Sequence, residues 1–186
     1  APPTPPRPRA ARRAVAGARH GLALASCMAA FDTLCKLFIP GDQVVAGADV
    51  YGGTFRLFEK QYAKYGIAFS YVNSTDLAAV TAGLRPNTRW VWLETPTNPL
   101  MRLTDLRAAA EHAHRHAAHL WREHPLASPY PQRPVEFGAS LVTHSTTKSP
   151  NATNTHTRPL RTTPRAHDQR DDDRATSPAT LWCRGI

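Results

Sequence analysis

The chain has little cysteine and no long apolar run. Its three cysteines, Cys27, Cys35 and Cys183, are widely spaced and form no Cys-x-x-Cys pair, which argues against a disulfide scaffold and fits a reducing compartment. The longest apolar run, residues 22–31, is well short of the ~20 residues that a membrane-spanning helix needs. The apolar stretch before Cys27, residues 21–26, is shorter than the core of about 7–15 residues in a secretory signal. We therefore predict a cytoplasmic protein without a membrane span.

Acidic residues are absent from residues 1–20, which contain five Arg and five Pro. Residues 149–186 contain six Arg, four Asp and four Pro among Thr, Ser and Asn. We predict that both ends are disordered, because neither has the apolar residues to bury, and that residues 21–148 form the folded domain. This middle part holds twelve Lys or Arg against ten Asp or Glu, so most of the net charge of +9 lies in the ends. A specific nucleic-acid surface needs basic residues on the folded part, so we expect none; nonspecific adsorption of the basic ends to polyanions is the alternative.

Two hydrophobic periodicities alternate along residues 21–148. Apolar residues at helical spacing predict helices over 28–38, 54–65, 77–84 and from 104 to 117, the third capped by Thr75 and the fourth with Ala117 facing inward. Short apolar runs predict strands over 44–46, 67–72, 90–93, 118–121 and 141–143. Helices alternating with buried strands are typical of an α/β fold, in which a mostly parallel sheet has helices on both faces.

Four loops of this fold carry residues with chemical potential. Cys27 and Met28 begin the first helix, whose free backbone amides favour an anion. Tyr51 offers a flat ring beside Gly52 and Gly53, where a ligand could approach the backbone, and two prolines stiffen the loop of Asn98. Lys148 follows three hydroxyl residues after the last strand. Taken singly, each loop is more often an ordinary helix start, a turn, a stiff loop or a solvated lysine.

Together, six motifs along residues 21–148 carry a resemblance. In chain order they read Ser-x-Met-Ala-Ala, Pro-Gly-Asp, Tyr-Gly-Gly-Thr-Phe-Arg-Leu-Phe, Glu-Thr-Pro-Thr-Asn-Pro-Leu, Ala-Ser-Pro-Tyr-x-Gln-Arg-Pro and His-Ser-x-Thr-Lys. Residues 21–148 thereby resemble the Cys/Met-metabolism family of pyridoxal-phosphate enzymes, which includes cystathionine γ-lyases and γ-synthases and methionine γ-lyases. The resemblance implies part of the large cofactor-binding domain of a fold-type I, aspartate-aminotransferase-like enzyme.

The resemblance also implies roles for individual residues. Lys148 is expected to hold pyridoxal 5'-phosphate as a Schiff base and to move protons, and Tyr51 to stack on the ring, so both are taken as catalytic. Glu123 occupies the position of the carboxylate that keeps the pyridinium nitrogen protonated. The expected cofactor-binding residues are Cys27, Met28, Tyr51, Asn98, Glu123, Ser145, Thr147 and Lys148. The implied reaction is elimination at a C–S bond or γ-replacement on a small sulfur amino acid, in a homotetramer.

The chain departs from the family pattern at several positions. Glu123 stands where the family has Asp, Pro125 removes a hydroxyl and an N–H, and Arg122 replaces an apolar residue whose site would bury the guanidinium at a cost of several kcal/mol. Cys27 stands in place of Gly, which would strain the backbone if φ were positive there. Because the resemblance stops at Lys148, we also expect a truncated or frame-shifted continuation.

Two alternatives to an active enzyme stay open. The first is an inactive family remnant or a defective subunit of the intact enzyme. The second is an interaction protein whose basic ends carry the function. His112 and His116, four residues apart, could clip a metal ion, but no Cys or acid completes a recognisable set, so we predict no metal site.

Overall fold

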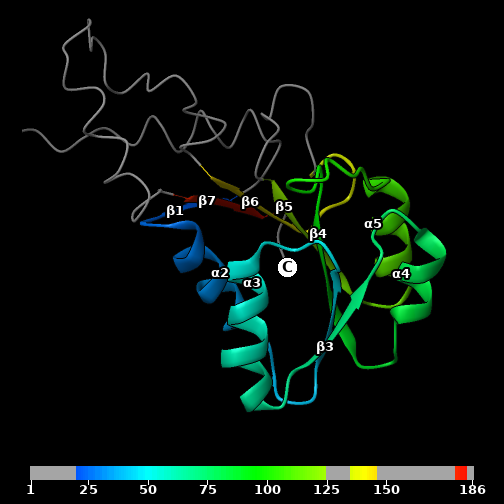
Figure 1. Cartoon of the computed structure of the whole chain (residues 1–186), viewed down its shortest axis with the longest axis horizontal. Coiled ribbons are helices and arrows are strands. Elements are labelled where there is room, and N and C mark those ends of the chain that lie inside the picture. The colour runs from blue at the N-terminus through cyan, green and yellow to red at the C-terminus, as the bar shows by residue number, and fades with distance from the viewer. Residues whose placement is uncertain (1–19, 125–134, 146–178, 184–186) are drawn as a thin grey trace, which may run out of the picture.

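A computed structural model describes residues 20–124, 135–145 and 179–183. Within these residues, seven strands form one sheet in the order β1-β7-β6-β5-β4-β2-β3 (Figure 1). The strands are β1 His20–Leu24, β2 Gln43–Gly47, β3 Ala68–Val72, β4 Thr88–Glu94, β5 His119–His124, β6 Leu141–Ser145 and β7 Ala179–Cys183.

The sheet is mostly parallel, as the sequence predicts. The neighbours from β3 through β2, β4 and β5 to β6 all pair in parallel. β7 pairs antiparallel with β6 on one side and with β1 on the other. Two strands are not among those predicted: β1, which overlaps the apolar run 22–31, and β7, which lies in the range 149–186 that we expect to be disordered. The reason is that five residues of mixed polarity carry too weak an alternation to stand out from a polar surrounding sequence.

Helices connect the parallel strands. They are α2 Cys27–Cys35, α3 Gly52–Leu57, α4 Leu77–Gly83 and α5 Leu106–Arg115, and α3 continues into a π-helical turn, η1 Phe58–Tyr62, and a 3-10 turn, η2 Ala63–Tyr65. None of the helices in the described ranges is long and apolar enough to cross a membrane.

Short polar side chains begin three of these helices. Ser26 caps α2 by accepting a hydrogen bond from the Ala29 amide at 3.0 Å, and Asp105 caps α5 through the Ala108 amide at 3.0 Å. The predicted cap Thr75 is wrong by one residue: Asp76 caps α4 by accepting from the Ala78 amide at 2.9 Å, while Thr75 bonds to Asn73. Asp and Thr are both good caps, so adjacent candidates cannot be ranked by type alone.

Two stripes of the predicted helices are only partly buried. The helix predicted over 54–65 rests on the helical spacing of Phe55, Phe58, Tyr62 and Tyr65, which would place them on one face. Phe58 is fully buried, but Phe55 and Tyr65 are exposed, because the change from α to π and 3-10 turns shifts the side-chain phase. Ala117 is exposed as well, since α5 ends at Arg115 and Ala117 has φ of +55°. Gly66 has φ of +78° and ends η2, in the left-handed conformation that glycine often supplies after a helix.

Helices cover both faces of the sheet, which confirms the predicted layers. α2 and α3 lie on one side, and α4 and α5 lie on the other (Figure 1). The first side is packed with aromatic rings: Phe31 meets Trp92 edge-on at 5.2 Å between centroids, and Phe58 meets Trp92 at 4.9 Å. We call this the aromatic face. The opposite side, the alanine face, joins the strands to Ala109, Ala110 and Ala113 of α5.

Candidate active site

The carboxyl ends of the parallel strands meet at one edge of the sheet. β2 ends at Gly47, β4 at Glu94, β5 at His124 and β6 at Ser145, all pointing the same way. Ligands of open α/β sheets bind outside this edge. The loops that follow β2 and β4 carry Tyr51 and Asn98, so they lie where the sequence analysis places the site.

Tyr51 lies between β2 and α3 with its ring half exposed. Its backbone N–H donates to Oε2 of Glu94 at 3.1 Å. The ring packs on Gly53, because a Cβ added there would lie 2.9 Å from Cδ1 of Tyr51, closer still to Cε1, and 3.0 Å from Sδ of Met28. Gly53 is thus approached by the ring of Tyr51, whereas Gly52 has open space around it. The structure brings Tyr51 and Met28 together at this glycine.

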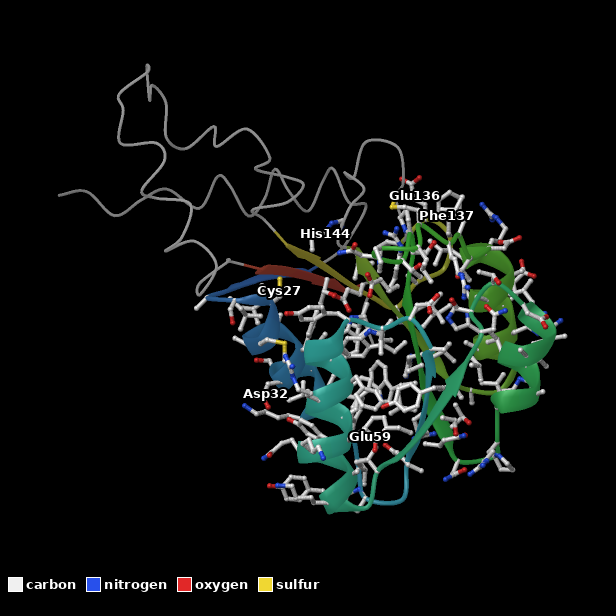
Figure 2. The ribbon with its side chains drawn as sticks, viewed as in Figure 1. Cys27, Asp32, Glu59, Glu136, Phe137 and His144 are labelled. Atoms are coloured by element: carbon white, nitrogen blue, oxygen red, sulfur yellow. The ribbon has the colours of Figure 1, made fainter. Side chains whose placement is uncertain are left out.

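Cys27 and Met28 form the first turn of α2. The side chain of Ser26 accepts a hydrogen bond from the Ala29 amide, and its carbonyl oxygen accepts one from the Ala30 amide at 3.1 Å. Figure 2 shows Cys27 at the end of α2 beside the strands. Among the described residues other than glycine, only Met101 and Ala117 have positive φ, so the strain considered for Cys27 is absent.

Asn98 is exposed in the loop that follows β4. Hydrogen bonds tie the loop to itself: Thr97 donates its amide to the carbonyl of Arg102 at 3.0 Å, and the Arg102 amide returns to Oγ1 of Thr97 at 3.1 Å. The Thr104 amide donates to Oγ1 of Thr95 at 3.0 Å. The peptide bonds Thr95-Pro96 and Asn98-Pro99 are both cis. These hydrogen bonds within the loop support the prediction of a stiff loop around Asn98.

Three polar residues stand in one row across the strand ends. Glu94 of β4 is in register with Glu123 of β5, and Glu123 is in register with Thr143 of β6. Each lies two residues after a residue of the aromatic face, namely Trp92, Trp121 or Leu141. Because side chains alternate along a strand, all three lie on that face. All are buried, with Glu94 3% and Glu123 7% exposed, and Trp121 donates its indole N–H to Oγ1 of Thr143 at 3.2 Å. Glu123, the predicted partner of a ring nitrogen, is thus at a strand end on the same face as α2 and α3.

Sequence reasoning did not single out Glu94 or Thr143. The sequence did contain a signal for Glu94. It directly follows the run from Trp90 to Leu93 and lies two residues after Trp92, which places both side chains on the same face of the strand. Its bond to the Tyr51 amide carried no signal, since it joins residues 43 positions apart.

Arg122 and His144 lie on the alanine face by the same alternation. Arg122 is completely buried and donates from Nη2 to the carbonyl oxygen of Thr95. Burial lowers the pKa of Arg122 to about 9, and burial together with the charge of Arg122 lowers the pKa of His144 to about 3. Arg122 is therefore buried, as its strand position implies, and its guanidinium has a backbone partner at the start of the Asn98 loop. Figure 2 shows His144 close to the carboxyl end of β6.

Some predicted site residues lie outside the described ranges. These are Thr147 and Lys148, together with Pro125. Ser145 is the last residue of β6, and the description covers its backbone only, which is in register with Ala179 of β7. Their predicted roles stay predictions.

The two histidines considered for a metal ion, His112 and His116, have hydrogen-bond partners within the protein. Nδ1 of His112 lies 2.6 Å from Oγ1 of Thr81, and Nδ1 of His116 lies 3.0 Å from the carbonyl oxygen of His112. In the part of the chain that the structure describes, no three His, Cys, Asp or Glu side chains are grouped so as to hold a metal ion.

The site offers three complementary features: helix amides at α2, a half-exposed aromatic ring at Tyr51, and a buried carboxylate at Glu123. Helix amides bind an anionic group, the ring stacks on a flat one, and a buried carboxylate accepts from a protonated ring nitrogen. The residues present therefore fit a phosphorylated pyridine. Fold and site together are those expected of a domain that binds pyridoxal phosphate.

The family model described as Cys/Met metabolism PLP-dependent enzyme matches residues 9–155. The chain belongs to this family, and the predicted cofactor is confirmed at the level of the family. The match extends beyond residues 21–148 at both ends, so the resemblance drawn from the motifs was too narrow.

Relatives of known sequence or structure agree with this assignment. The chain is 44% identical over 132 residues to the cystathionine gamma-synthase/O-acetylhomoserine (thiol)-lyase of Bacillus subtilis, covering 71% of this chain and 35% of that protein. It is 40% identical over 131 residues to the cystathionine gamma-lyase of Dictyostelium discoideum, covering 70% and 34%. The crystal structure of cystathionine gamma-lyase from Lactobacillus plantarum complexed with L-serine matches with a TM-score of 0.80 and 32% identity, covering 95% of this chain and 41% of that one. The chain thus spans well under half the length of these relatives.

Proposed function

We propose that the chain forms the cofactor-binding part of a pyridoxal-phosphate-dependent transsulfuration enzyme. Its reaction is elimination at a C–S bond of a sulfur amino acid, as in the lyase relatives, or γ-replacement, as in the synthase relatives. The observation that carries the proposal is the buried Glu123 at the end of β5, on the face where the Tyr51 loop and α2 also lie.

The residues divide the work of binding. The amides of Cys27 and Met28 and the hydroxyls of Ser145 and Thr147 hold the phosphate, and Glu123 accepts from the ring nitrogen. Pyridoxal phosphate supplies an electron-withdrawing ring that stabilises negative charge on a substrate carbon.

The remaining predicted residues act on the substrate side. Tyr51 covers one face of the ring, and Asn98 orients the ring and the substrate carboxylate. The amine of Lys148 would hold the cofactor, and it would accept and return protons at substrate carbons.

Titration of the 186-residue chain with pyridoxal phosphate tests the proposal. We expect a visible absorption band of lysine-bound cofactor that is absent in Lys148→Ala. Absence of the band in the unmodified chain, or its persistence in Lys148→Ala, would contradict the proposal.

A second assay separates the two reactions. Release of a keto acid from cystathionine would indicate elimination, and formation of cystathionine from an acylated homoserine and cysteine would indicate replacement. Cofactor binding without turnover of either would favour the inactive remnant or defective subunit. A small amino-acid substrate, a homotetrameric assembly, a cytoplasmic location and the absence of a specific nucleic-acid partner belong to the same proposal.

A further inference from the structure

About half of Tyr51 is exposed to solvent. The residue is 53% exposed, and its ring lies against Gly53, where an added Cβ would come within 2.9 Å of Cδ1 of Tyr51. Tyr51 precedes α3 as its N-cap, and its side chain makes no capping hydrogen bond. The position of the ring therefore depends on how the backbone of Tyr51 is anchored.

Glu94 supplies this anchor from the sheet. Its Oε2 accepts the Tyr51 N–H at 3.1 Å, and the side chain is only 3% exposed, at the last position of β4. A hydrogen bond from an amide to a buried carboxylate is stronger than one between neutral groups. The strand that carries Glu94 is held on both sides, by β2 and β5, so the acceptor is fixed.

A second, weaker link joins the same two loops near the surface. Arg102, in the loop after β4, lies with Nη1 3.2 Å from Oδ2 of Asp49, two residues before Tyr51. Their side chains are 49% and 25% exposed, so solvent screens this pair. The Tyr51 loop is thus held by a partly buried hydrogen bond at Tyr51 and by a more exposed ion pair at Asp49.

From these contacts we infer that Glu94 is a positioning residue, which holds the Tyr51 ring against Gly53 through the Tyr51 amide. The role assigned to the ring rests on the proposed function, but the placement of the ring by Glu94 does not. The Asp49–Arg102 pair contributes less to this placement.

Nuclear magnetic resonance of the labelled 186-residue chain tests the placement without cofactor. In the unmodified chain we expect a slowly exchanging Tyr51 amide and a nuclear Overhauser contact between the Tyr51 ring and the α-protons of Gly53. Glu94→Leu removes the acceptor at similar volume; the Tyr51 amide should exchange about tenfold faster and the ring contact should weaken or disappear. Glu94→Gln keeps an acceptor and should retain both signals.

Two further variants sharpen this comparison. Glu59→Leu removes another carboxylate that accepts one hydrogen bond, from the Tyr71 hydroxyl at 2.8 Å, and should leave the Tyr51 signals unchanged. Arg102→Met should accelerate exchange of the Tyr51 amide by no more than about threefold, since exposed pairs are weak. A Tyr51 amide that exchanges as fast as an unstructured peptide in the unmodified chain would overturn the inference, whether or not the variants fold. So would an unchanged ring contact in a folded Glu94→Leu.

Pyridoxal-phosphate titration of the same variants separates this inference from the proposed function. If Glu94 positions Tyr51 for the cofactor, Glu94→Leu should weaken cofactor binding about tenfold, with Glu94→Gln close to the unmodified chain. If Glu94→Leu loses the ring contact but keeps its cofactor affinity, the claim that Glu94 positions Tyr51 for the cofactor would be overturned. No binding to any form would overturn the proposed function, while the resonance data would still decide whether Glu94 places the ring.

Discussion

The two faces of the sheet are built from different side chains and end in different chemistry. The aromatic face packs Phe and Trp rings under α2 and α3 and ends in Glu94, Glu123 and Thr143. The alanine face packs small residues of α5 closely and ends in the buried bases Arg122 and His144. The aromatic face, with the carboxylates of Glu94 and Glu123 at its strand ends, can receive a flat, protonated ring. The buried bases on the alanine face support the strand ends and the Asn98 loop. Among the described residues, the carboxylates at the strand ends lie on the aromatic face and the buried bases lie on the alanine face.

The largest expected effect on stability concerns the buried rings of the aromatic face. Trp92→Ala removes a fully buried ring that contacts Phe31 and Phe58, and should lower the free energy of unfolding by about 3–5 kcal/mol. On the alanine face, Ala113→Leu should cost about 1–3 kcal/mol by overpacking. Urea denaturation measures both. We expect the larger loss of unfolding free energy on the aromatic face, and a smaller loss for Trp92→Ala than for Ala113→Leu would contradict this expectation.

The second prediction concerns the pH dependence that the alanine face imposes. The pKa of His144 is lowered to about 3 in the folded chain, so the unfolded chain binds the extra proton between pH 6.5 and 3. The stability that His144 contributes is complete above pH 6.5 and is lost as pH falls, with a slope of up to about 1.4 kcal/mol per pH unit. Urea denaturation from pH 7 to 4 should show a shallower loss in His144→Asn than in the unmodified chain. Equal slopes would show that His144 does not control this dependence.

The third prediction concerns the hydroxyl of Thr143, which lies in register with Glu123. Thr143→Val keeps the shape but removes the acceptor of the Trp121 indole N–H, so it should cost about 1–3 kcal/mol. Ser140→Ala, next to the same strand, is the control and should have a smaller effect. Both are measured by thermal unfolding, and equal losses would contradict a specific role for the Trp121 bond.

The smallest effects compare helix caps on the two faces. Ser26→Ala and Asp105→Ala each remove a cap and should each cost about 1 kcal/mol of stability. Only Ser26→Ala should also weaken pyridoxal-phosphate binding, because α2 begins at the proposed phosphate site and α5 does not. Equal effects of the two variants on cofactor affinity would remove the distinction between the faces.

Much of the fold follows from short-range patterns. The Trp90 to Leu93 run and the Leu106, Ala109, Ala113 spacing predict β4 and the inward face of α5, because burial on one or both faces leaves a clear period. The family motifs also place Tyr51, Asn98 and Glu123 at strand ends. The bond between Glu94 and Tyr51, the partner of Arg122 and the strand β7 could not be predicted, since each depends on residues brought together only by the fold.

The antiparallel insertion of β7 has a consequence for how the chain reaches its native state. β1 contacts the rest of the sheet through β7, so the first described strand is docked by the last one. The β2 to β6 block is assembled from near neighbours in the chain, whereas the β1–β7 pairing has the highest contact order in the sheet. Closing so long a stretch of chain is entropically costly and slow. On a ribosome, the sheet edge beside α2 must therefore wait until residues 179–183 have been synthesised.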